Sequence, residues 1–213
     1  ASSRGHVQET PTGKITFAFT IRNQMTSSLA TVKAAVENKD LLYNYQQRFF
    51  KSALDNAKKD KYKAYVFGDA HDRNRTNAFI DKLLLHRIKV YKLAQRTTQN
   101  GQTFDPSFAY AVPTDQPQYR MVQTMFETYD EYTDSVFYDA SAWSLANFYN
   151  MPFAGMTSSV NKGEEVLEIS QMNVDVPESN YAYMIKWEDY NAPAVMYHLQ
   201  KGGANVLSAF KPF

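Results

Sequence analysis

The stretch Lys61–Leu93, with the sequence KYKAYVFGDAHDRNRTNAFIDKLLLHRIKVYKL, decides the fold that we expect for this chain. It begins with the apolar run Ala64–Phe67, which a glycine ends, a pattern typical of a buried strand. Asp72 can cap a following helix, because apolar residues then recur at three- and four-residue spacing. Lys89–Leu93 returns as a second strand. The stretch therefore predicts a right-handed βαβ unit with two parallel strands.

Similar patterns occupy the rest of the chain. Further strands are predicted at Phe108–Val112, Val136–Tyr138, Tyr181–Trp187 and Asn205–Phe210, and further helices after Asp115, Ser141 and Asp189. About five βα units with turn residues between them predict an α/β fold. We expect one mostly parallel, doubly wound sheet of the Rossmann-like kind, with helices on both faces in three layers.

The first sixty residues contain fewer residues that end helices or strands. Ile15–Ile21 alternates between apolar and polar or small residues, which predicts a strand with one buried face. A helical stripe follows from Ser27 or Ser28 to about Lys59, and its length favours a break near Asn38–Asp40. The run of lysines at 58–61 is typical of a solvated helix end, where cations suit the helix dipole.

Composition excludes several classes of protein. Of 213 residues, 44% are hydrophobic and 21% charged, an ordinary balance for a folded globular chain. A formal net charge of +1 gives no overall field that would favour nucleic acid or an anionic membrane. No apolar run approaches the roughly 20 residues that span a bilayer. The chain contains no Cys, which excludes a cysteine nucleophile, a thiolate metal site and any disulfide.

Charged residues gather after the predicted strands. In a parallel sheet, ligands bind beyond the carboxyl ends of the strands. Two arginines fall in the first turn of the helix that Asp72 caps, where a cation opposes the helix dipole unless an anion is bound. The candidate ligand-binding residues are Arg73, Arg75, Asp115, Arg120 and Tyr190. They predict a site for an anion or a carboxylate; the alternative is that the arginines are solvated or pair with Asp69, Asp72 or Asp115.

Two patterns suggest catalysis only superficially. His6 and Glu9 have the HxxE spacing of a zinc pair, but a zinc site needs a third ligand, and the other histidines fall in unrelated units. We therefore predict that the chain holds no metal and no cofactor. Ser141 follows a strand and opens a helix like a nucleophile elbow, yet the flanking glycines are absent and a helix cap explains it. No glycine-rich phosphate loop occurs.

Several segments resemble one family of proteins. They are ASSRG at 1–5, ITFAFTIRNQMTSSLATVKAAVENK at 15–39, VFGD at 66–69, PTDQPQYR at 113–120, FYDASAWSL at 137–145, YAYMIKW at 181–187 and AFKPF at 209–213. Nearly the whole chain is similar to the region downstream of the catalytic core in large bacterial zinc carboxypeptidase-like proteins of the carboxypeptidase A type. In that family the core holds zinc through an HxxE pair and a later His, and a Glu acts as general base. The similar region begins after that Glu, so His6 and Glu9 do not match the zinc pair and no catalytic residue carries over.

The resemblance implies an organisation and a role. Residues 1–25 would be a trailing strand or linker from a preceding peptidase domain, and residues 26–213 an α/β accessory domain that is not itself an enzyme. Its partners would be the peptidase domain and its peptide substrate, without nucleic acid or a membrane span, in a secreted or periplasmic protein. The α/β part also resembles class I glutamine amidotransferase-like folds, although it lacks their cysteine nucleophile.

Two other functions stay open from the sequence. The first is a module that binds a small molecule or a peptide carboxylate in the cleft at the strand ends. The second, less well supported, is a hydrolase built on Ser141 with a neighbouring His and Asp.

Overall fold

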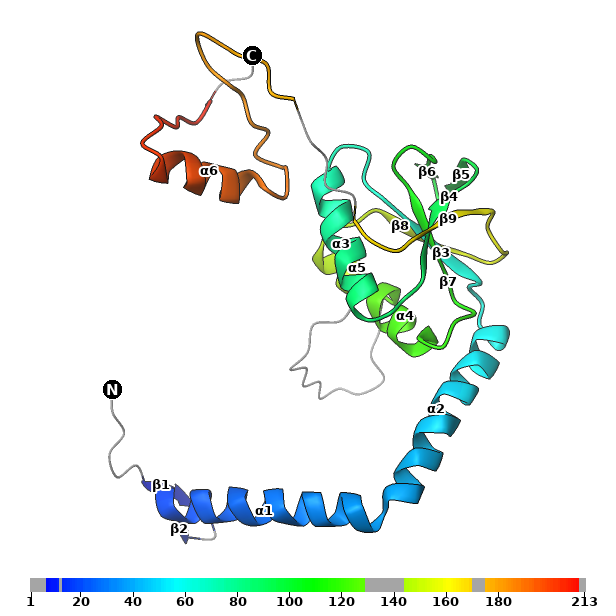
Figure 1. Ribbon diagram of the computed structural model, residues 1–213, viewed down its shortest axis with the longest axis vertical. Coiled ribbons are helices and arrows are strands. Elements are labelled where there is room, and N and C mark those ends of the chain that lie inside the picture. Colours follow the sequence, from blue (N-terminus) through cyan, green and yellow to red (C-terminus); the bar gives the residue numbers. More distant parts are fainter. Residues whose placement is uncertain (1–6, 12, 129–143, 170–174, 211–213) are drawn as a thin grey trace. The chain divides into compact units, whose positions relative to one another are not determined.

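The computed structural model describes residues 7–11, 13–128, 144–169 and 175–210 (Figure 1). It divides into two compact units, residues 1–51 and 52–213, and each is described by itself.

The first unit is a hairpin followed by helices. Strands β1 (Val7–Thr10) and β2 (Gly13–Thr16) pair antiparallel, and α1 (Phe17–Glu37) and α2 (Lys39–Lys59) follow, with α2 continuing into the second unit. The predicted strand Ile15–Ile21 is wrong beyond Thr16. The Thr16 side chain accepts a hydrogen bond from the backbone N–H of Phe19 at 3.2 Å, and this cap starts a helix where the alternation suggested a strand.

The predicted break between the two helices is confirmed. Asn38 leaves the helical conformation with φ −110° and ψ 23°. Its backbone N–H and its side-chain amide both donate to the carbonyl of Ala34, at 3.0 and 2.8 Å. This local bonding satisfies a carbonyl at the end of α1 and lets α2 begin at the next residue.

The second unit contains a five-stranded sheet in the order β8-β3-β7-β4-β9. Its strands are β3 (Ala64–Phe67), β4 (Val90–Leu93), β7 (Tyr110–Pro113), β8 (Phe153–Met156) and β9 (Lys162–Val166). Every neighbouring pair is antiparallel. The fold is thus mixed α/β, but the mostly parallel, doubly wound, Rossmann-like sheet that the sequence predicts is wrong.

The central βαβ unit explains how that error arises. β3 and β4 run in the same direction with α3 (Arg73–Leu85) between them in sequence, since both are antiparallel to β7. They are not neighbours, however, because β7 lies between them. The four strands β8-β3-β7-β4 therefore have the split βαβ connectivity of ferredoxin-like sheets. Local periodicity specified each element, whereas pairing across the sheet specified the neighbours.

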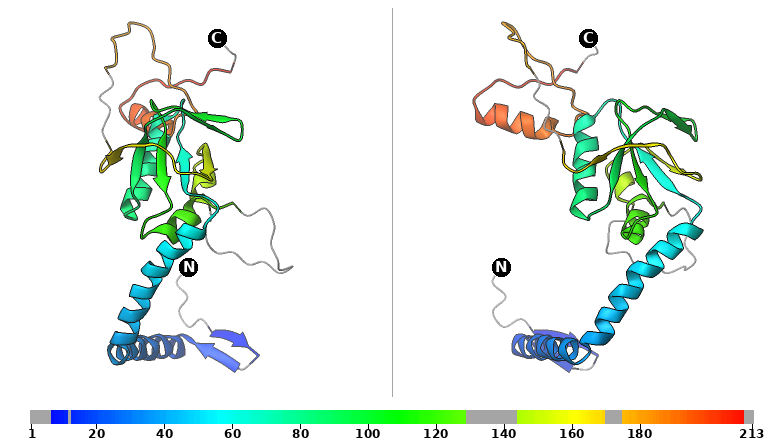
Figure 2. Two further views of the ribbon diagram at one scale, coloured as in Figure 1. Left: turned by 90° about the vertical axis from the view of Figure 1, so that its right-hand side faces the viewer. Right: turned by 45° about the vertical axis from the view of Figure 1, so that its right-hand side comes forward.

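Three helices that follow β3 in the sequence cover one face of the sheet (Figures 1 and 2). They are α3, α4 (Tyr119–Phe126) and the short α5 (Leu145–Phe148). Tyr65 and Phe67 of β3 point toward them: the Tyr65 ring stacks on Phe126 with centroids 4.7 Å apart, and Phe67 meets Phe79 edge-on at 5.2 Å. Because side chains alternate along a strand, Val66 points to the other face.

That other face is covered by a hairpin. The polar connection after β4 forms β5 (Thr97–Gln99) and β6 (Gln102–Phe104), which pair antiparallel. Phe104, 1% exposed, packs in a second cluster with Val66, Ala111 and Ala154. The β5-β6 hairpin therefore takes the place of the helix layer that the sequence predicts on this face.

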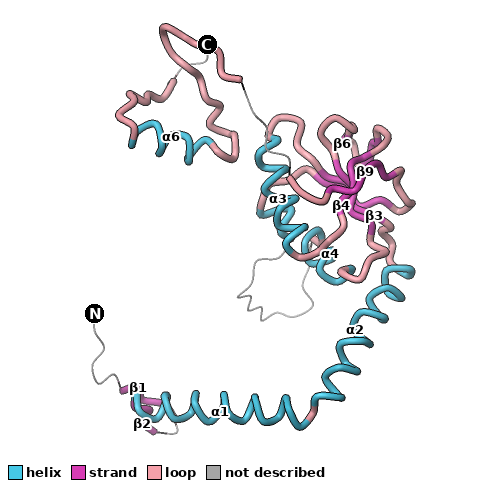
Figure 3. Tube along the Cα trace, in the orientation of Figure 1, coloured by secondary structure: helices cyan, strands magenta, loops and turns pink. Residues whose placement is uncertain are grey.

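The C-terminal part differs from the predictions. Tyr181–Trp187 and Asn205–Phe210 are not strands but irregular backbone on either side of α6 (Ala192–Lys201), as Figure 3 shows. A strand needs backbone partners, and in the described residues neither segment has them. The predicted strand Val136–Tyr138 and the cap at Ser141 lie outside the described residues.

Candidate functional site

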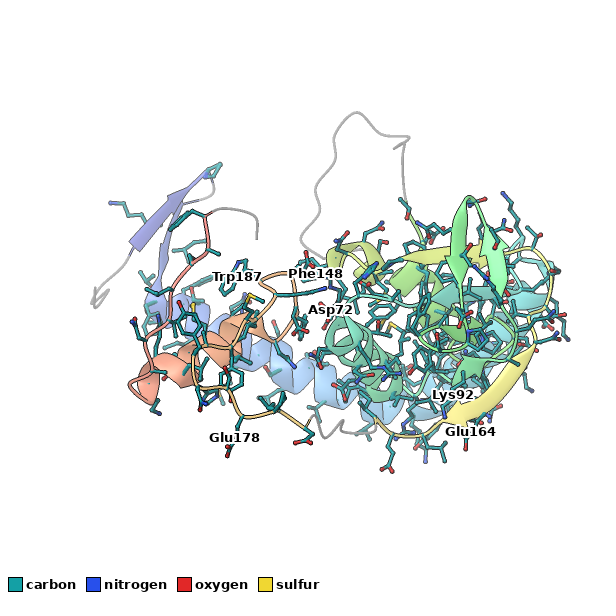
Figure 4. The ribbon with its side chains drawn as sticks, turned by 90° about the horizontal axis from the view of Figure 1, so that it is seen from above. Asp72, Lys92, Phe148, Glu164, Glu178 and Trp187 are labelled. Atoms are coloured by element: carbon teal, nitrogen blue, oxygen red, sulfur yellow. The ribbon has the colours of Figure 1, made fainter. Side chains whose placement is uncertain are left out.

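The N-terminus of α3 gathers several charged side chains. Asp72 caps the helix as predicted, since its Oδ1 accepts from the backbone N–H of Arg75 at 2.8 Å. The guanidinium of Arg75 contacts two carboxylates: Nη1 lies 3.2 Å from Oδ2 of Asp69, and Nη2 lies 3.2 Å from Oδ2 of Asp72. Figure 4 shows Asp72 at the start of this helix. Asp72 is only 3% exposed, so its charge needs these partners.

A distant segment completes the arrangement. Oδ2 of Asp72 accepts from the backbone N–H of Tyr190 at 2.8 Å, and Arg75 Nη2 donates to the carbonyl of Glu188 at 3.1 Å. The side-chain amide of Asn74 donates to both carboxylate oxygens of Asp189, at 3.1 and 3.0 Å. These bonds fix residues 188–190 on the first turn of α3. We call this set the α3 N-terminal cluster: Asp69, Asp72, Asn74, Arg75, Glu188, Asp189 and Tyr190.

The cluster neutralises the charge of Arg75. Arg75 pairs with Asp69 and Asp72, as the alternative reading of the arginines predicted, and it also donates to the carbonyl of Asn150 at 3.3 Å. The free N–H groups and positive dipole end of a helix favour an anion. Here the chain's own carboxylate, that of Asp72, takes that place. The geometry describes a structural clamp between α3 and residues 188–190.

The predicted site residues divide between the two ends of the sheet. Tyr190 and Arg75 come together, and Arg73 lies nearby with its Nη2 donating to the carbonyl of Ser107 at 3.3 Å. Asp115 and Arg120 follow β7, whose last residue Pro113 pairs with Ala64, the first residue of β3. They therefore lie at the opposite end of the strands from Arg73, Arg75 and Tyr190.

Strand direction is the reason for this division. Carboxyl ends of parallel strands meet at one edge of a sheet, whereas those of antiparallel neighbours alternate between the two edges. Because β3 and β7 are antiparallel, Asp115 and Arg120 do not lie at the same end of the strands as the other predicted site residues, Arg73, Arg75 and Tyr190.

A cavity of about 360 Å³ lies at the end of the sheet where β7 ends, and Asp115 is one of its lining residues. The sequence analysis missed it, since its lining residues come from three separated segments, 57–64, 113–115 and 159–162. Lys63 is held there by backbone carbonyls: its Nζ donates to Lys58 at 2.9 Å and to Asp60 at 2.6 Å. The lysine run at 58–61 was the only local signal, and it is equally typical of a solvated helix end.

The same edge contains a buried tyrosine with an altered pKa. The hydroxyl of Tyr119 donates to Oδ2 of Asp60 at 2.7 Å. Burial, together with this hydrogen bond and the charge of Asp60, raises the pKa of Tyr119 to about 12. Asp60 Oδ1 also accepts from the backbone N–H of Tyr62 at 3.0 Å. Asp60 thus joins the end of α2, the start of β3 and α4.

The remaining predictions on chemistry are not decided by this geometry. Across residues 7–11, 13–128, 144–169 and 175–210, no three His, Asp or Glu side chains are grouped so as to hold a metal ion. His6 and Ser141 lie outside that part of the chain, so the absence of zinc and of a serine hydrolase site stay predictions. No helix in the described part has both the length and the apolar character needed to cross a membrane.

Comparison with known proteins adds no assignment. No protein-family model, no curated protein and no solved structure matches this chain. The resemblance to the region downstream of a peptidase core therefore supports only a proposal.

Proposed function

We propose that this chain is a non-catalytic accessory domain of a zinc carboxypeptidase-like protein, which packs on the peptidase core or shapes the access of peptide substrates. The resemblance of its segments to that downstream region supports the family. The surface of α1 supports the packing role.

The observation that carries the proposal is an exposed apolar stripe on α1. Its members recur at spacings of four, four, four, three and four residues, which places them on one face of the helix: Phe17, Ile21, Met25, Leu29, Val32 and Val36. Each is between 52% and 69% exposed. Soluble monomers rarely leave a contiguous apolar surface open, and such surfaces typically mark sites of interaction with another protein. We call these six residues the α1 stripe.

The stripe is suited to a docking surface because little charge interrupts it. The whole of α1 carries Arg22, Lys33 and Glu37 as its charged residues. Helices that face water on all sides usually carry many more charges. A packed partner surface would bury the stripe and contribute roughly 25 cal/mol for each Å² of apolar area removed from water.

The test measures binding between this chain and the catalytic core of the parent protein, expressed as separate polypeptides. We expect a saturable complex by calorimetry. Val32→Glu should weaken it about tenfold or more, because the charge would be desolvated in the contact. Ser27→Glu is the matched control, since Ser27 lies on the opposite face of the same helix and should leave binding unchanged.

Two results would contradict the proposal. One is no association of the wild-type chain with the core. The other is equal weakening by Val32→Glu and Ser27→Glu, which would show that the α1 stripe is not the contact surface.

A further inference from the structure

A second feature of the molecule is independent of the peptidase resemblance. It is the cavity of about 360 Å³ at the edge of the sheet where β3 begins and β7 ends. We call it the lysine-rimmed cavity, and its lining residues are Ala57, Lys58, Lys63, Ala64, Pro113, Thr114, Asp115, Ser159, Val160 and Lys162. Its volume falls in the range of about 300–1,000 Å³ that is typical of small-molecule sites.

The floor of the cavity is apolar. Ala57 of α2 and Ala64 of β3 are 2% and 1% exposed, and Pro113 at the end of β7 is also buried. Val160, half-buried, lines the cavity from the loop before β9. Ala57, Ala64 and Pro113 are therefore packed behind the cavity, and the half-buried Val160 is the apolar side chain of the lining that offers surface to a ligand.

The rim carries an excess of positive charge. It has three lysines, Lys58, Lys63 and Lys162, against one carboxylate, Asp115, which gives a formal net charge of +2. Lys58 lies 3.7 Å from Asp55, and both side chains are largely exposed, so this pair neutralises it weakly. Within the described residues, Lys63 and Lys162 take part in no ion pair.

The two unneutralised lysines are nevertheless positioned. Lys63 Nζ donates to the carbonyls of Lys58 and Asp60, at 2.9 and 2.6 Å, which uses two of the three N–H donors of an ammonium. Lys162 Nζ lies 5.1 Å from the centroid of the Tyr91 ring, a cation–π distance. A carboxylate could therefore bind to ammonium groups whose positions are set before it arrives.

We propose that the lysine-rimmed cavity binds a small organic monocarboxylate with an apolar body. The carboxylate contacts Lys63 and Lys162, and the apolar body covers Val160 over the floor that Ala57 and Ala64 form. A purely hydrophilic anion such as phosphate would contact the lysines but leave the apolar floor uncovered. A neutral molecule of the same shape would cover the floor but leave the lysines without a counter-charge.

The experiment is an NMR titration of the full chain, following the backbone amides of residues 63–64 and 114–115. The probes are hexanoate, its neutral analogue hexan-1-ol, and inorganic phosphate. Hexanoate should produce saturable shifts at these amides, and hexan-1-ol and phosphate should each bind about tenfold more weakly or worse, which corresponds to the loss of one contact. The double variant Lys63→Gln/Lys162→Gln should weaken hexanoate about tenfold or more.

Controls separate a site from a general effect of charge. Lys82→Gln removes one positive charge from α3, outside the cavity, and should leave hexanoate binding unchanged. Lys162→Gln alone removes a side chain that makes no hydrogen bond to the backbone in the described residues, so it tests the site even if the double variant folds poorly.

Several outcomes would overturn the proposal. They are absence of saturable shifts with hexanoate, equal affinity for phosphate, and binding that Lys162→Gln leaves unchanged. Each is independent of whether the chain binds a peptidase core, so a failure of this proposal would not be confused with a failure of the proposed function.

Discussion

Helices α1 and α3 carry apolar stripes of the same kind, and their surroundings are opposite. On α3, Phe79, Ile80 and Leu83 are at most 1% exposed under the sheet. On α1, Leu29 and Val32 are 63% and 64% exposed. The periodicity that makes a helix amphipathic is therefore present in both, and among the described residues only the stripe of α3 is covered within its own unit. An amphipathic pattern predicts that a partner surface exists, and does not say whether that surface belongs to the same chain.

The largest expected effect tests this contrast with one substitution on each helix. Leu83→Ala should lower the free energy of unfolding by about 2–5 kcal/mol, because it opens a cavity in a packed core. Leu29→Ala should change it by about 0.5 kcal/mol or less, since an exposed side chain loses few contacts. Both substitutions replace Leu by Ala within a helix, so the change in helix propensity is the same in the two variants. Urea unfolding followed by near-ultraviolet circular dichroism of the buried aromatic cluster measures both.

A large effect of Leu29→Ala would break the comparison. It would mean that the α1 stripe is covered by this chain in solution, and the docking surface of the proposed function would be lost.

Backbone strain gives a second, somewhat smaller contrast. Gly68, at the end of β3, has φ +151°, and a Cβ there would lie 2.5 Å from the carbonyl oxygen of Phe108. Gly68→Ala should cost about 1–3 kcal/mol in strain and about 1–3 kcal/mol more in steric overlap. Gly13 also has positive φ, at +128°, but a Cβ there meets nothing within 4 Å. Gly13→Ala should leave the near-ultraviolet transition of the sheet where it is.

If Gly13→Ala shifted that transition as far as Gly68→Ala does, the hairpin and the sheet would unfold together. The two units would then have to be treated as one cooperative body.

A third prediction concerns pH. The pKa of Tyr119 is raised from its ordinary value near 10 to about 12, first by burial and then by Asp60. The folded state thus holds the phenolic proton more tightly than the unfolded state. The resulting stability is fully present below pH 10 and is lost as the pH rises from about 10 to about 12. Between pH 10 and pH 12 the free energy of unfolding of the wild type should therefore fall by roughly 1–3 kcal/mol.

Tyr119→Phe is the control for that loss. It should be less stable at pH 7 by about 0.5–1.5 kcal/mol, because the hydrogen bond to Asp60 is gone. Its stability should then fall less steeply than that of the wild type between pH 10 and 12, in urea midpoints measured at half-unit steps. Equal slopes for the two proteins would assign the alkaline loss to other groups, including Tyr65, whose pKa burial also raises.

The smallest effect is expected at an exposed pair on the edge of the sheet. Lys92 Nζ of β4 lies 2.8 Å from Oε2 of Glu164 of β9, and Figure 4 shows the two side chains together. The hydrogen bond to Glu164 raises the pKa of Lys92. Glu164→Gln should return that pKa toward its ordinary value in an NMR titration and leave the urea midpoint unchanged, since exposed ion pairs contribute little to stability. A clear fall in the midpoint would show that this pair secures β9.

Local patterns predicted several elements correctly and the relations between them incorrectly. The strand at Ala64–Phe67, the cap at Asp72 and the break at Asn38 are confirmed. Each depends on residues within a few positions of one another. Tyr181–Trp187 is rich in aromatic and apolar residues and was predicted as a strand, yet it stays irregular and Tyr181 is 99% exposed, because a favourable local composition does not supply a hydrogen-bonding neighbour.

The candidate site shows the same limit. Pairing of Arg75 with Asp69 and Asp72 was accessible from the sequence, since residues 69–75 contain all three groups and the helix cap fixes their geometry. The clamp on Tyr190 was not accessible from the sequence, because it joins segments that are more than a hundred residues apart. The lysine-rimmed cavity was not accessible either, because its lining is spread over residues 57–162.

The sequence by itself determined β3, β4 and β7, the helices α3 and α4 that pack on them, and where α3 begins. The tertiary structure decided that β7 enters between β3 and β4, which makes the sheet antiparallel and sends Asp115 to the opposite edge from Arg75. The physical reason is that helix caps and periodicity act through neighbouring residues. Strand order, in contrast, is set by the long-range burial of a sheet face and by the satisfaction of backbone groups across it, which no local pattern encodes.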